Sequence, residues 1–160
     1  MNSWLTWRAK AHDAVNDLGL LALRLWAGQE FFLAGYTKLS GGLQAPDWFA
    51  GLDLPLPNPP LPADLNRLAA GAGEAPLGPA LILGLWSRLA ALGLLFVTYV
   101  AVYTVHFGLG WSGWNQIETE DGQGFKVPLM LAIMLLAIVT QGGGHYALDA
   151  WRRWVRPKPS

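Results

Sequence analysis

Long apolar stretches constrain this chain more than any other feature. The run from Leu89 to Val105 reads LAALGLLFVTYVAVYTV and contains no charged residue. The hydrocarbon core of a bilayer needs about 20 residues of helix to cross it. The sequence predicts four helical spans, at about residues 16–38, 64–86, 87–108 and 125–151. We therefore expect an all-α fold, an integral membrane four-helix bundle that forms one domain of 160 residues.

The composition narrows the possible functions. Hydrophobic residues make up 52% of the chain and charged residues 14%, as expected of a membrane protein in contact with a lipid bilayer. The formal net charge is zero, which argues against nucleic-acid binding, because that needs a basic surface. There is no cysteine, so the chain itself supplies neither thiol chemistry nor iron–sulfur ligands. Any redox role must come through a bound cofactor or a partner protein.

The distribution of lysine and arginine predicts the orientation, because cytoplasmic loops carry an excess of these residues. One side of the predicted spans carries Arg8, Lys10, Arg88, Arg152, Arg153, Arg156 and Lys158. The other side carries Lys38, Arg67 and Lys126. Both termini are therefore expected in the cytoplasm, and the loops 39–63 and 108–124 on the outer side. The first loop is rich in proline and also apolar, so we expect it to fold back as a cap.

Two acidic residues interrupt the predicted spans, Glu30 in the first and Glu74 in the second. A charged side chain at bilayer depth costs about 2.5–3.5 kcal/mol on insertion scales, so such residues usually face a bundle interior. With a rise of about 1.5 Å per residue, both acids lie about 10–15 Å from the outer surface. We therefore expect the two carboxylates to face each other, with Lys38 and His106 completing a candidate outer polar site.

Simpler roles compete with this site. A structural hydrogen bond between the two helices explains the two acids about as well as proton transfer does. Lys38 can extend its ammonium group to the lipid headgroups while its stem stays in the membrane. His106 is most simply an interface histidine without a ligand role, although a proton relay from it to Glu74 is an alternative.

A second group of polar residues is predicted at the inner end of the spans, formed by Arg24, Arg88, His145 and Asp149. Pairing of the arginines with Asp149, which would lock helix ends together, is favoured over direct chemistry. The histidines argue against haem, since His106 lies near the outer face and His145 near the inner face. We predict no metal site.

Three stretches resemble the DoxX family of small bacterial membrane proteins. The first is RLWAGQEFFLAGYTKL, residues 24–39, whose arginine, glycines and lysine are similar to that family's opening signature. The second is Gly73-Glu74, followed by LGLWSRLAALG over residues 83–93. The third is GGGHYALD, residues 142–149, which resembles Gly-Pro-Gly-x-x-Ser-Leu-Asp but departs from it at Gly143 and Ala147.

The resemblance implies a bundle in the bacterial inner membrane and a link to redox systems, one of them a thiosulfate:quinone oxidoreductase. We expect a membrane subunit or accessory protein of a redox system, with quinone as its candidate cofactor. An apolar slot between the first two spans would hold the quinone beside Glu30 or Glu74, with its walls formed by Trp26, Phe31, Phe32 and Leu77. The alternative is a non-catalytic assembly or structural subunit of a larger membrane protein complex. Transport of a small ion or metal is a third hypothesis.

Overall fold

The computed structural model describes residues 3–42, 44–52, 55 and 62–155. Most of these residues are helical, so the predicted all-α class is confirmed. In chain order the elements are α1 (Ser3–Ser40), α2 (Asp47–Ala50), α3 (Ala63–Leu83), α4 (Ser87–Ala101), the π-helix η1 (Val102–His106), the 3-10 helix η2 (Gly110–Asn115), β1 (Glu118–Thr119), β2 (Gly122–Gln123), α5 (Lys126–Gln141) and α6 (Leu148–Val155).

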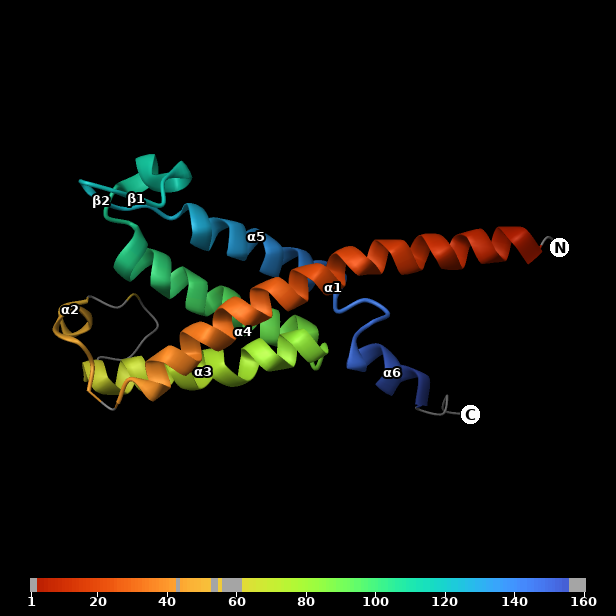
Figure 1. Cartoon of the computed structure of the whole chain (residues 1–160), viewed down its shortest axis with the longest axis horizontal. Coiled ribbons are helices and arrows are strands. Elements are labelled where there is room, and N and C mark those ends of the chain that lie inside the picture. Colours follow the sequence, from red (N-terminus) through yellow and green to blue (C-terminus); the bar gives the residue numbers. More distant parts are fainter. Residues whose placement is uncertain (1–2, 43, 53–54, 56–61, 156–160) are drawn as a thin grey trace.

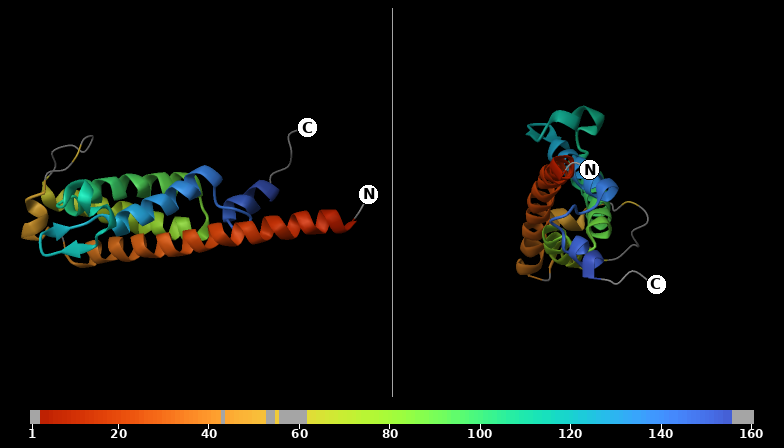
Figure 2. Two further views of the ribbon diagram at one scale, coloured as in Figure 1. Left: turned by 90° about the horizontal axis from the view of Figure 1, so that it is seen from above. Right: turned by 90° about the vertical axis from the view of Figure 1, so that its right-hand side faces the viewer.

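Helices α1, α3, α4 and α5 share one apolar core (Figure 1). Each helix contributes residues that are almost fully buried: Ala27, Phe31, Leu81, Ala90, Ala91, Leu94, Leu135 and Ile138. The first helix is longer than the predicted span, and its N-terminal part extends beyond the other helices (Figure 2). Each of these helices buries one apolar face and leaves its other faces exposed. The buried faces therefore determine how the four helices pack.

Facing glycines bring α1 and α3 into close contact. A Cβ atom at Gly28 would lie 2.7 Å from the carbonyl oxygen of Gly78. A Cβ atom at Gly35 would lie 2.5 Å from the amide nitrogen of Ala75. Neither distance accommodates a side chain, so the two helices touch backbone to backbone, as small residues allow in membrane proteins.

A turn of three residues, 84–86, joins α3 to α4 and makes them an antiparallel hairpin. Gly84 adopts the left-handed conformation, with φ of 72°, which a residue without Cβ adopts at little cost. Trp86 is also left-handed, with φ of 45°. Its backbone N–H donates to a carboxylate oxygen of Asp149 at 2.9 Å, which stabilises this unusual conformation.

The helix that begins with α4 continues through η1, so Ser87–His106 forms 20 helical residues. Within the described part of the chain, this is the one helix that is long and apolar enough to cross a membrane by length and composition. Helix α5 is apolar but has 16 residues. Charged residues such as Arg24 in α1 and Glu74 in α3 interrupt the other two helices. Four membrane spans therefore stay a prediction.

The predicted span 125–151 is wrong in its C-terminal part, because α5 ends at Gln141. Gly142 and Gly144 have φ of 87° and 72°, where a glycine is favoured and a regular helix cannot continue. The chain therefore leaves α5, passes α1 and α3, and enters the short helix α6.

Polar contacts hold the start of the outer loop against α3. The buried side chain of Arg67 donates to the carbonyl oxygens of Gly42 and Gln44, at 2.8 and 2.9 Å. The amide of Ala45 donates to Asp64 at 2.5 Å. This loop contains α2, whereas much of its proline-rich part, residues 53–54 and 56–61, lies outside the described residues.

Candidate functional site

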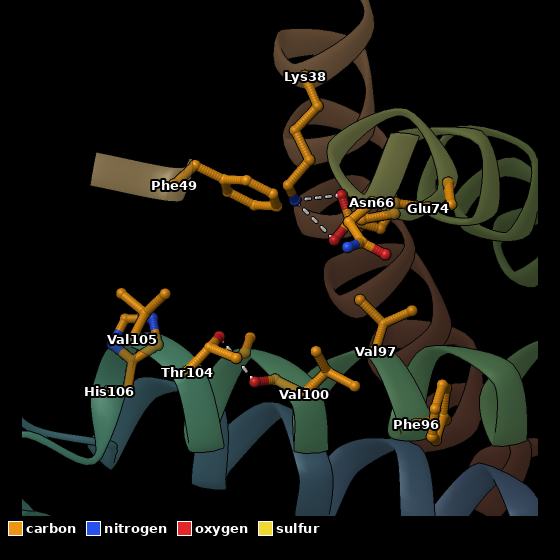
Figure 3. A pocket seen from close by; sticks show the side chains of 13 residues that line it. Lys38, Phe49, Asn66, Glu74, Phe96, Val97, Val100, Thr104, Val105 and His106 are labelled. Carbon is orange, nitrogen blue, oxygen red and sulfur yellow. Dashed lines mark hydrogen bonds and ion pairs between the residues drawn. The ribbon is translucent and has the colours of Figure 1, made fainter. Parts of the chain in front are cut away.

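A cavity of about 430 Å³ lies between α3 and the continuous helix α4–η1, next to the C-terminal end of α1. Most of its walls are apolar, formed by Ala69, Ala70, Phe96, Val97, Val100 and Val105. Figure 3 shows Phe49 of α2 and Lys38 on the side opposite the α4–η1 side chains. An apolar cavity with a few polar groups is the usual form of a small-molecule site.

The main polar feature of the cavity is an ion pair between α1 and α3. The ammonium group of Lys38 donates to both carboxylate oxygens of Glu74, at 2.7 and 2.5 Å (Figure 3). The Glu74 side chain is 5% exposed and that of Lys38 is 30% exposed. An ammonium group has three donors, so two of them hold Glu74 and one remains.

His106 lines the same cavity from the end of η1. Its ring is hydrogen-bonded to the backbone of Gly124. Its Nδ1 atom is buried and has no hydrogen-bond partner among the described residues. Thr104, two residues before His106 on η1, donates its hydroxyl to the carbonyl oxygen of Val100 at 2.9 Å. The structure therefore brings Lys38, Glu74 and His106 to one cavity.

The expectation that Glu30 faces Glu74 is wrong. Glu30 is exposed on the side of α1 that does not pack against α3. The inward side of α1 carries Gly28 and Gly35, and Glu30 lies off that side because successive helical residues are about 100° apart. Lys38 takes the place beside Glu74 that was expected for Glu30.

The predicted quinone slot is also not where the sequence placed it. Trp26 and Phe32 are 60% and 40% exposed, and Phe31 is buried in the helical core. Leu77 packs against the core and would touch a side chain at Gly93 of α4. The backbone contacts made by the glycines of α1 and α3 leave no room for a ring between these helices.

At the other end of the bundle, Arg24 is fully buried and joins three segments of the chain. Its guanidinium lies against Gly84 and donates from Nη2 to the carbonyl oxygen of Tyr146 at 3.2 Å. The carboxylates of Asp17 and Asp149 attract its charge. Its Nε and Nη1 atoms have no hydrogen-bond partner among the described residues.

Asp149 joins the start of α6 to the start of α4. Its Oδ1 accepts from the backbone of Trp86 at 2.9 Å, and its Oδ2 accepts from the backbone and hydroxyl of Ser87, at 2.8 and 3.1 Å. These contacts cap α4 at its N-terminus. Arg88 donates instead to the carbonyl oxygen of Thr140 on α5, at 3.2 Å.

His145 lies in the same region but pairs with a residue that the sequence did not single out. Its ring Nδ1 contacts the carboxylate of Asp17 on α1, and its backbone N–H donates to the same oxygen at 2.9 Å. The inner group thus connects α1, the α3–α4 turn and the segment after α5. Its dense internal contacts indicate a structural role.

A family model described as DoxX matches residues 19–107, more than half of the chain. The chain belongs to the DoxX family. An uncharacterized protein of Haemophilus influenzae (strain ATCC 51907 / DSM 11121 / KW20 / Rd) is 34% identical over 147 residues, which cover 91% of this chain and 90% of that protein. No solved structure matches the chain.

DoxX membership makes this a membrane protein of a family related to redox-associated subunits. The matched region includes Lys38, Glu74 and His106, together with the α4 wall of the cavity. Among the residues described, no three histidine, aspartate or glutamate side chains are grouped to hold a metal ion.

Sequence reasoning missed several residues of the candidate site. Phe49 and the wall residues Val97, Val100 and Thr104 line the cavity. The spacing of those three, at intervals of three and four, places them on one helical face and was a usable signal. Phe49 lies in α2, a helix of four residues that is too short for periodicity to indicate the direction of a side chain.

Proposed function

We propose that this DoxX chain is a membrane subunit of a redox system and binds a quinone in the cavity beside Lys38 and Glu74. The observation that carries the proposal is a partly buried ion pair on the wall of an apolar cavity of about 430 Å³. Ligand sites of about 300–1,000 Å³ with few polar groups are typical of small amphipathic molecules. A quinone has an apolar ring and two carbonyl oxygens that need hydrogen-bond donors.

The polar groups of the cavity suit the two ends of such a ring. The third N–H of Lys38, which the Glu74 carboxylate does not use, can donate to one carbonyl oxygen. Glu74 holds the ammonium in place and can exchange a proton with it. The Nδ1 atom of His106, which has no partner among the described residues, can accept a hydrogen bond from a hydroxyl of the reduced quinol at the η1 end. Because the chain has no cysteine, we assign electron delivery to a partner subunit.

The same proposal places α1, α3, α4 and α5 across the bacterial inner membrane with both termini in the cytoplasm. The excess of lysine and arginine on one side supports this orientation. The exposed apolar surfaces of α4 and α5, which include Leu92, Ile133 and Leu136, support contact with lipid.

Photolabelling with an azidoquinone tests the proposal. The label, added to membranes that contain the protein, is expected in the peptides around residues 66–74 and 96–106, which line the cavity. An excess of unmodified quinone should abolish it. Labelling confined to the lipid-facing surface of α5, where Met130 and Ile133 are exposed, would contradict the proposal.

A second candidate function is that of a non-catalytic assembly subunit. It is favoured by the outer segment between η1 and α5, where Trp111 and Trp114 are 80% and 59% exposed. Large exposed aromatic residues are frequent in protein interfaces. Stable association with a membrane protein partner, without any labelling of the cavity by azidoquinone, would favour this function over the first.

A further inference from the structure

The exposed carboxylate of Glu30 lies on an apolar face of α1. Its neighbours along this face are Trp26, four residues before it, and Leu33, three residues after it, which are 60% and 50% exposed. Gln29, the adjacent residue, is exposed as well. No hydrogen bond or ion pair reaches Glu30 from the part of the chain that the structure describes.

The contacts of α1 define the level of Glu30 in the bundle. Gly28 packs against Gly78 of α3, so Glu30 lies close to that level. Leu77, the neighbour of Gly78, reaches Gly93 of α4. Gly93 is six residues inside the apolar helix Ser87–His106, or about 9 Å from its start. Glu30 is therefore level with the interior of that helix and far from either end.

A carboxylate that faces lipid at this level is unfavourable, and residues of this kind normally pair with a polar group. Within its own chain the nearest cations on α1 are already engaged. Arg24 is fully buried at the inner end, and Lys38 is bound to Glu74. In the described part of the chain Glu30 therefore has no polar partner, which leaves its carboxylate available to a partner molecule.

We propose that the α1 face formed by Trp26, Gln29, Glu30 and Leu33 packs against the same face of a second copy. This inference rests on the membrane placement of α1 in the proposed function. A two-fold axis along the membrane normal brings residues of the same depth together, as in most homodimers. The Gln29 amide of each copy then donates to the Glu30 carboxylate of the other.

The face fits this occupant for two reasons. First, the face carries the Gln29 amide, which is a hydrogen-bond donor, beside the Glu30 carboxylate, which is an acceptor. Two copies of this face are therefore complementary, whereas a different protein would have to supply a cation at the depth of Glu30. Second, Trp26 and Leu33 flank the polar pair on both sides along the helix. In the dimer they enclose the hydrogen bonds and exclude other polar groups, which strengthens them.

The absence of cysteine allows a direct test, because a single introduced cysteine cannot form a disulfide within its own chain. Trp26→Cys and Leu33→Cys, in separate proteins, are expected to give a crosslinked dimer when native membranes are oxidised. Leu92→Cys on α4 and Ile133→Cys on α5 are matched controls, 54% and 60% exposed in the parent chain, and should stay monomeric. Equal crosslinking at all four positions, or none at the α1 positions, would overturn the proposal.

A second variant isolates the role of the polar pair. In the Leu33→Cys protein, Glu30→Leu is expected to reduce the crosslinked fraction, through a loss of about tenfold in dimer affinity. Glu30→Gln, which keeps a hydrogen-bonding group, should retain most of the dimer. A dimer that is unchanged by Glu30→Leu, or replacement of the second copy by a different membrane protein at this face, would overturn the inference.

The result can be separated from failure of the proposed function. If a membrane-impermeant thiol reagent modifies Trp26→Cys in intact membranes, the membrane placement of α1 is itself wrong. If the cysteine is protected but forms no dimer, only the interface is wrong. Azidoquinone labelling of the cavity is expected to be the same in Glu30→Leu and the parent protein.

Discussion

Lys38 on α1 donates hydrogen bonds to both carboxylate oxygens of Glu74 on α3, at 2.7 and 2.5 Å. The pair lies at the edge of an apolar cavity, where water does not screen it as it would at a protein surface. A charge in such a place is tolerated because its partner is fixed by the close packing of the two helices. The glycine contacts, the ion pair and the cavity therefore depend on one another.

Removal of Lys38 alone should destabilise the protein. Lys38→Met leaves the nearly buried Glu74 without its partner, which we expect to lower the free energy of unfolding by about 3 kcal/mol. The double variant Lys38→Met with Glu74→Leu should recover most of this loss. Thermal unfolding in detergent measures both, and a double variant no more stable than Lys38→Met alone would contradict the pairing.

The contact between α1 and α3 should not tolerate a methyl group at Gly35. Gly35→Ala places a Cβ atom 2.5 Å from the amide nitrogen of Ala75, and we expect a loss of about 1–3 kcal/mol in unfolding free energy. Gly19→Ala on the same helix is the control, because nothing lies within 4 Å of its Cβ position. The explanation fails if the two variants unfold at the same temperature.

Asp149 should be required for the α3–α4 turn. Asp149→Ala removes the acceptor for Trp86 and Ser87 and one of the two charges that face Arg24. We expect a loss of about 2 kcal/mol in unfolding free energy, since Asp149 is a partly buried charged acceptor. The control is Asp121→Ala, which changes an exposed residue of the outer hairpin. Equal melting temperatures for the two variants would show that Asp149 does not stabilise the turn.

The contact between Asp17 and the segment after α5 should be visible in hydrogen exchange. The backbone N–H of His145 donates to Asp17, so Asp17→Ala is expected to increase the exchange rate of this amide. The amide of Gly124, which donates to the carbonyl oxygen of Ile117 at the other end of the bundle, is an internal control. Unchanged protection of His145 would mean that Asp17 does not hold this segment.

Depth along the helices was predictable from the sequence, whereas the direction of each side chain was not always inferred correctly. Counting residues placed Lys38, Glu74 and His106 at the same end, and the structure brings them to one cavity. Glu30 has a suitable depth but the wrong direction. The inward face of α1 is marked by Arg24, Gly28, Phe31, Gly35 and Lys38, at intervals of three and four, and Glu30 lies outside that series.

The extent of the last long helix and the position of the cavity were harder to predict. The apolar composition on both sides of residue 141 suggested a longer span than the observed Lys126–Gln141. The cavity depends on how α3 and α4 diverge and on a loop residue, Phe49, that covers it. Helical periodicity predicts neither the divergence of the two helices nor the position of Phe49, since both are set by packing between elements.

The quinone content of purified protein tests the central claim most directly. The parent protein, Lys38→Met and Glu30→Gln would be purified from the same membranes, and the extracted quinone measured per mole of protein. We predict that Lys38→Met, which removes the donor in the cavity, lowers the content about tenfold or more, while Glu30→Gln leaves it unchanged. Equal quinone in all three proteins, or no quinone in the parent, would contradict the account.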